Sequence, residues 1–105
     1  MSPDQLAKYR KALTNLTATV ERELAWEKEE VARGKGSGVT AADAAVAVLA
    51  ADEELLGEAK AALARIDSGT FGACEWCGRA IPATRLDAIP YARRCARCEN
   101  ETPGA

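Results

Sequence analysis

The chain has 105 residues, a formal net charge of −2, four cysteines, no histidine and only 5% aromatic side chains. A chain of this length forms one domain, or a rod with one small subdomain, and much of its 48% apolar content is alanine, which argues against a large spherical core. The weak negative charge excludes a polyanion binder that works through bulk charge.

The first predicted helix begins at Ser2, which suits the N-cap position, with Pro3 as the first helical residue and Asp4 against the positive end of the helix dipole. Apolar residues then recur every three or four positions, as in a coiled coil. They are Leu6, Tyr9, Leu13, Leu16 and Val20, followed after a one-residue shift by Leu24 and Val31.

Three glycines between positions 34 and 38 end this helix. A second helix is predicted from about Thr40 to Ile66, with Gly69 just beyond its end. Two helices of similar length joined by a short loop fold back antiparallel. The apolar stripe of the second helix comprises Leu49, Leu56 and Leu63, seven residues apart, with Ala45, Ala59 and Ile66 at the alternate positions of the stripe. Asp52 falls in that stripe, so it either faces solvent near a kink or weakens the seam.

The cysteines form two C-x-x-C pairs separated by 17 residues; the four positions are Cys74, Cys77, Cys95 and Cys98. Four thiolates around one tetrahedral ion make a closed structural zinc site, with no open position for catalysis. Gly78 follows the first pair, where a positive φ lets backbone N–H groups turn toward the sulfurs. The second pair leads into residues that permit a helix, whose dipole favours thiolate.

Two other uses of the cysteines compete with zinc. The first is a pair of disulfides or redox-active dithiols, which the doubled metal-type spacing and the absence of a secretory signal at residues 1–5 disfavour. The second is iron bound by the same four sulfurs. No run approaches the roughly 18 apolar residues of a membrane span. We therefore expect a cytoplasmic protein, in which thiols stay reduced.

The run from Gly69 to Gly78, the later Arg85–Ala88 segment, and the four cysteines resemble the zinc finger of the DksA/TraR family. The resemblance implies an all-α fold: an antiparallel two-helix coiled-coil hairpin over residues 1–68, with its tip loop at about 34–40, followed by a four-cysteine zinc finger over residues 69–105. It also implies a transcription regulator, not an enzyme, that binds bacterial RNA polymerase and inserts its hairpin through the secondary channel. Family members do not read DNA sequence, and we expect a monomer.

The tip departs from the family pattern. Well-known members carry D-x-x-D-x-A there, whereas this chain has Thr40, Asp43 and Ala45 at the corresponding positions, with the basic Lys35 close by. The resemblance makes these four residues the candidates for contact near the polymerase active site. Thr40 as N-cap with Asp43 three residues later is equally an ordinary capping arrangement.

Some family members help to form a site for guanosine tetraphosphate with three basic residues. The corresponding positions here are Glu58, Ile89 and Glu99. Acidic or apolar side chains do not pair with a pyrophosphate. The sequence therefore predicts little dependence on this nucleotide.

Two rival functions remain. Five arginines in the finger allow a zinc-ribbon nucleic-acid binder, although nearby acidic residues offset most of their charge. Alanine-rich helix faces allow a coiled-coil adaptor or homodimer, in which two hairpins form a four-helix bundle. An enzyme is disfavoured because the chain has no histidine, no nucleophile–base pair and no phosphate-binding loop.

Overall fold

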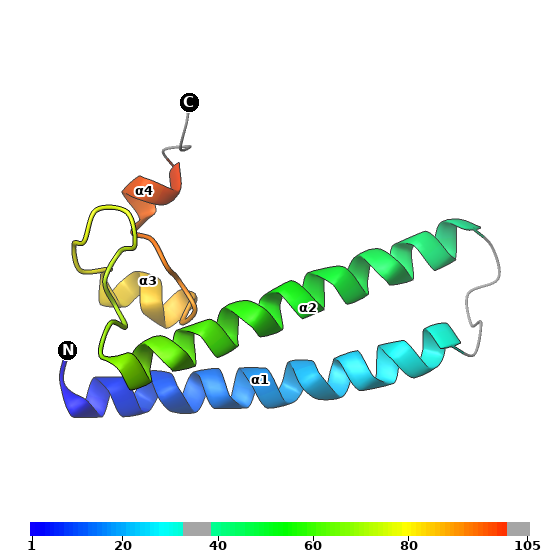
Figure 1. Ribbon diagram of the computed structural model, residues 1–105, viewed down its shortest axis with the longest axis horizontal. Coiled ribbons are helices and arrows are strands. Elements are labelled where there is room, and N and C mark those ends of the chain that lie inside the picture. The colour runs from blue at the N-terminus through cyan, green and yellow to red at the C-terminus, as the bar shows by residue number, and fades with distance from the viewer. Residues whose placement is uncertain (33–38, 101–105) are drawn as a thin grey trace.

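The computed structural model describes residues 1–32 and 39–100. The predicted hairpin is present: helices α1 (Pro3–Ala32) and α2 (Val39–Ser68) lie side by side and antiparallel (Figure 1). The finger follows, with two short helices, α3 (Ala83–Ala88) and α4 (Ala96–Asn100). It lies beside α2 at the end of the hairpin where α1 begins. The all-α fold class predicted from the sequence is thus confirmed.

Both ends of the hairpin base are fixed by local chemistry. The Ser2 hydroxyl accepts a hydrogen bond from the Gln5 backbone N–H, and the Ser2 N–H donates to the Gln5 side chain, which makes a capping box at the start of α1. At the end of α2, Gly69 has φ of +81°, and the Thr70 N–H bonds back to the Arg65 carbonyl at 2.9 Å. Gly69 therefore ends α2 as a left-handed C-cap residue.

The seam between α1 and α2 follows the predicted stripe on α1. Tyr9, Leu13, Val20 and Leu24 are all buried. The buried Thr17 satisfies its hydroxyl by donating to the Thr14 carbonyl at 2.8 Å. Among the described residues, exposed ion pairs cross the seam and mark its antiparallel register; they join Arg10 to Asp67, Glu21 to Lys60, and Lys28 to Glu53.

The α2 side of the seam differs from the sequence prediction in detail. Ala59 and Ala62 are fully buried there, whereas Leu49, Leu56 and Leu63 are only half-buried. Alanine lets two helix backbones approach closely, so these positions form the centre of the contact and the leucines flank it. Ala62 was not among the predicted seam residues.

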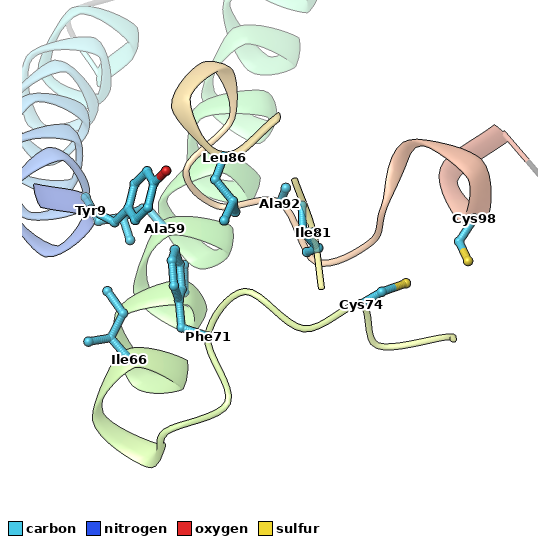
Figure 2. Packing of buried hydrophobic residues seen from close by; sticks show 11 residues of the cluster. Tyr9, Ala59, Ile66, Phe71, Cys74, Ile81, Leu86, Ala92 and Cys98 are labelled. Carbon is cyan, nitrogen blue, oxygen red and sulfur yellow. The ribbon is translucent and has the colours of Figure 1, made fainter. Parts of the chain in front are cut away.

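A second contact joins the finger to the hairpin. Figure 2 shows Phe71, Ile81, Leu86 and Ala92 of the finger gathered against Tyr9 and the α2 side chains. The rings of Tyr9 and Phe71 have centroids 5.5 Å apart. The Tyr9 hydroxyl donates a hydrogen bond to Asp87 Oδ1 at 2.8 Å, and Lys8 Nζ lies 3.0 Å from the same oxygen. Among the described residues, no helix is both long enough and apolar enough to cross a membrane.

Candidate metal centre

The first cysteine pair lies on a tight turn. The flanking residues Ala73 and Ala80 form an antiparallel bridge, and the Cys74 N–H donates to the Arg79 carbonyl at 2.8 Å. The turn closes with the Gly78 N–H on the Cys74 carbonyl at 3.0 Å, and Gly78 has φ of +73°. The positive φ that the sequence predicted at Gly78 is therefore present.

The second pair lies at the start of α4, as predicted. Cys95 immediately precedes the helix, and its carbonyl accepts a hydrogen bond from the Glu99 N–H at 3.0 Å. Cys98 lies inside the helix and is buried. The two pairs are held together by the Glu75 N–H, which donates to the Arg93 carbonyl at 2.9 Å.

The four sulfur atoms converge. All lie within 4.8 Å of one another, and the Sγ atoms of Cys77 and Cys95 are 3.8 Å apart. A tetrahedral ion with zinc–sulfur bonds of about 2.3 Å separates its sulfurs by about 3.8 Å. Figure 2 shows the sulfurs of Cys74 and Cys98 turned away from the hydrophobic cluster and toward each other. The donor set therefore fits one zinc ion.

The electrostatics of the cluster also favour a cation. Burial raises the pKa of the Cys74 thiol, but backbone N–H groups donate to its sulfur and together lower that pKa to about 6; the donors are Trp76, Cys77 and Cys95. By contrast, a hydrogen bond with Cys95 and burial raise the pKa of Cys98 to about 12. Four adjacent thiols do not all ionise unaided, and a divalent ion supplies the missing positive charge.

An aromatic ring and an arginine lie together beside the first cysteine pair. Trp76 remains 39% exposed, and the Arg94 guanidinium stacks over its ring at 4.0 Å from the centroid. Arg94 also pairs with Glu99 at 3.4 Å. Trp76 thus forms a cation–π contact at the surface of the finger.

Three of the candidate tip residues lie near the start of α2, at the end of the hairpin opposite the finger. The α2 backbone begins at Val39, so Thr40 and Asp43 occupy its first two turns, with Ala45 next. The side chains of these residues lie outside the described part of the structure, and Lys35 lies outside it entirely. Their proposed contact with polymerase stays a prediction.

The three positions tied to the alarmone are brought together. Glu58, Ile89 and Glu99 line one crevice of about 420 Å³ between α2 and the finger. Arg93 pairs with Glu58 at 3.0 Å across it. The sequence showed that these three positions are acidic or apolar. Nothing in the sequence indicated that Glu58 pairs with Arg93 or that Glu99 pairs with Arg94.

Comparison with known proteins identifies the finger. Residues 69–102 match the family described as the prokaryotic dksA/traR C4-type zinc finger. The C-terminal module is a DksA/TraR-type zinc finger. The metal of such a C4-type finger is zinc, so the predicted structural zinc is confirmed, and the predicted likeness to the DksA/TraR family is confirmed over residues 69–102.

Two curated relatives match part of the chain. The chain is 55% identical over 40 residues to an uncharacterised protein of Aquifex aeolicus and 52% identical over 42 residues to general stress protein 16O of Bacillus subtilis. These segments cover 38% and 40% of this chain but only 28% and 26% of the two relatives.

Solved structures extend the likeness to the hairpin. Transcription factor DksA2 from Pseudomonas aeruginosa superposes with a TM-score of 0.85, covering 95% of this chain and 84% of its own, at 21% identity. The RNA polymerase binding protein and transcriptional regulator Dks from Chlamydia trachomatis superposes with a TM-score of 0.65, covering 95% of this chain and 88% of its own, at 20% identity. At these identities the match establishes the fold: a DksA-type hairpin followed by a DksA/TraR-type finger.

Proposed function

We propose that this protein is a transcription regulator that binds bacterial RNA polymerase and inserts its hairpin through the secondary channel to modulate initiation. The observation that carries the proposal is the DksA2-like fold over 95% of the chain, combined with a finger of the DksA/TraR family. The Chlamydia protein of the same fold is described as an RNA polymerase binding protein. We place the protein in the cytoplasm, as a monomer without sequence-specific DNA binding.

The shape supports this role. Each long helix has 30 residues and is therefore about 45 Å long at 1.5 Å per residue. The distal part of the hairpin is only two helices wide, whereas the finger widens the base (Figure 1). A thin rod can enter a channel, and a broader base limits how far it goes.

Asp43, with Thr40 and Ala45 beside it and Lys35 nearby, is our candidate for contact near the polymerase active site. The α2 backbone carries Asp43 at the end of the hairpin that lies opposite the finger. A carboxylate there interacts with metal ions and alters the local field. A basic Lys35 in the same region acts in the opposite sense.

Binding to purified polymerase tests the proposal. We expect polymerase to retain the wild-type protein in a pull-down. Deletion of residues 34–38 should weaken the effect of the protein on transcription initiation. Asp43→Ala should also reduce the effect on initiation but should leave polymerase binding intact. Asp4→Asn, which neutralises an acidic residue at the base of the hairpin, is the control and should behave as wild type. Absence of polymerase binding by the zinc-loaded wild type contradicts the proposal. Retention of duplex DNA at physiological salt favours the nucleic-acid-binding alternative instead.

We also propose that the response depends little on guanosine tetraphosphate. In the crevice, the arginines at positions 93 and 94 are already paired with Glu58 and Glu99. A pyrophosphate entering there meets two carboxylates and must displace them. Initiation at a ribosomal promoter is the measurement: we expect the factor's effect to change little when the nucleotide is added. A large gain that requires both factor and nucleotide refutes this proposal alone and leaves polymerase binding intact.

A further inference from the structure

Two acidic side chains meet in the distal part of the hairpin. Glu27 of α1 and Asp52 of α2 are both half-buried. The neighbouring Lys28–Glu53 and Glu21–Lys60 ion pairs place them at the same level of the seam, and their carboxyl groups are close enough to interact. The Oε2 atom of Glu27 is buried and has no hydrogen-bond partner. A buried acceptor without a donor is destabilising, and two facing carboxylates add repulsion. The sequence had placed Asp52 in the stripe without showing what it faces.

The charges around this pair do not compensate it. Glu23 lies one turn before Glu27 on α1 and adds a further negative charge. Lys28 and Glu53 form the next pair across the seam, with nitrogen and oxygen 3.5 Å apart and both side chains more than half exposed. The finger packs against the opposite end of the hairpin (Figure 1). Among the described residues, the groups that act on Glu27 are therefore carboxylates.

The location makes the pair consequential. Leu24, one turn earlier, is the last buried apolar residue described on α1. Beyond it, the described side chains of α1 are half-buried or exposed. A change of charge at Glu27 therefore acts where the described part of α1 has no buried apolar side chain beside it to dominate the contact.

We propose that Glu27 and Asp52 form a proton-sensitive clasp, which takes up one proton from solvent as the pH falls and then tightens this part of the hairpin. With one proton bound, the carboxylic acid donates a hydrogen bond to the facing carboxylate, and the repulsion disappears. At pH values above the raised pKa of Glu27 that proton is lost, and the helices separate more readily at this level. The clasp is a property of the isolated protein and does not depend on the proposed partner.

The direction of the pH effect follows from linkage. Burial is the main cause that raises the pKa of Glu27 above its ordinary value. Interaction with the Asp52 carboxyl group, through a hydrogen bond and through its charge, raises this pKa further, as does the charge of Glu23. Between the ordinary and the raised pKa, the folded chain binds more protons than the unfolded chain. Stability therefore falls as pH rises through that window, and the loss is complete above the raised pKa.

Thermal unfolding of the zinc-loaded protein at several pH values between 5 and 7.5 tests the clasp. We expect Glu27→Gln to raise the midpoint by about 2–4 °C at pH 7.5 and by much less at pH 5. Glu29→Gln neutralises an exposed glutamate on the same helix. It is the control and should keep the wild-type pH dependence of the unfolding midpoint. Because every variant retains the four cysteines, the pH dependence of zinc binding cancels in the comparison. A Glu27→Gln variant with the wild-type pH dependence overturns the proposal.

A local signal separates the clasp from other titrations. The chain has two tryptophans, and Trp26, next to Glu27, is 60% exposed. In a Trp76→Phe background, Trp26 emission therefore reports on this part of the hairpin. We expect a step in emission between pH 5 and 7.5 that disappears in both Glu27→Gln and Asp52→Asn. A step that persists in these variants, or no step in the background protein, overturns the proposal.

Discussion

The base and the distal part of the hairpin are stabilised in different ways. At the base, three elements meet: α1 and α2 pack on each other, and the finger adds Phe71 and Leu86 to the same cluster. Farther along the hairpin the described contacts are between α1 and α2 alone, and beyond Leu24 they include the exposed Lys28–Glu53 ion pair and the half-buried Glu27–Asp52 pair. The comparison indicates that buried packing fixes the angle between rod and finger, whereas the described seam beyond Leu24 relies more on charged side chains.

Loss of the metal has the largest expected effect, and it is confined to the base. Zinc binding to a structural site contributes about 10–16 kcal/mol to the folding of such a module. Cys98→Ser replaces a buried ligand, so we expect zinc stoichiometry to fall and residues 71–98 to lose protection from amide exchange. The helices of the hairpin keep most of theirs.

Ala96→Ser is the matched control for that experiment, because it places a hydroxyl beside the cysteines without removing a ligand. It retains one zinc per chain. If chelation unfolds the hairpin together with the finger, the two regions are coupled more strongly than we infer.

Truncation of a buried leucine distinguishes the two regions directly. Leu13 is fully buried within the base cluster, whereas Leu24 is buried outside it. We expect Leu13→Ala to lower the free energy of unfolding by about 3–5 kcal/mol and Leu24→Ala by about 2 kcal/mol, because the distal site relaxes more easily around a cavity. Denaturant unfolding measures both. Equal costs contradict the asymmetry between base and distal part.

The hydrogen bond from Tyr9 to Asp87 is the next most important contact at the base. Tyr9→Phe removes it at a cost of about 1 kcal/mol, because the acceptor is half-exposed. Hydrogen bonds from Tyr9 and Lys8 lower the pKa of Asp87. Its stabilisation is therefore complete above the ordinary pKa of about 3.9 and is lost as pH falls toward the lowered value.

In Tyr9→Phe this acid-induced loss is smaller, which unfolding at pH 3 to 6 measures. Tyr91→Phe is the control, since Tyr91 contributes its backbone carbonyl, bonded by Arg65, to the same junction. An unchanged acid limb in Tyr9→Phe contradicts the role assigned to the Tyr9–Asp87 contact.

The smallest expected effects come from replacing one glycine with alanine in the rod and, separately, one glycine with alanine in the finger. Gly57 lies within α2 with open space around it, so Gly57→Ala stabilises the rod by about 0.5–1 kcal/mol. Gly78 also has open space but a φ of +73°, so Gly78→Ala destabilises the finger by about 1 kcal/mol. The two unfolding midpoints should shift in opposite directions. A shift in the same direction shows that backbone conformation does not decide the outcome.

The sequence predicted those features that depend on local chemistry. The helix start at Ser2, the helix end at Gly69 and the turn at Gly78 each follow from one residue's backbone or capping preference. The four cysteines follow from their spacing, because each C-x-x-C pair holds a metal from one side. These features need no knowledge of which segment packs against which.

Features that depend on tertiary contact were not predictable in the same way. Tyr9 appears in the sequence as a seam residue, but its hydroxyl reaches Asp87, 78 positions away. Periodicity assigns a residue to a helix face and does not identify its partner across the seam. The same limit hid the burial of Ala62 and the meeting of Glu27 with Asp52.

The crevice between α2 and the finger reaches only part of the way along α2, so the length of the hairpin can change beyond it. Ala51 is the residue of its lining that lies farthest from the finger along that helix. Seven residues added to each helix beyond this level preserve the phase of the seam and lengthen the rod by about 10 Å. The reach of such a protein can therefore be adjusted in whole heptads while the finger and its junction keep their geometry.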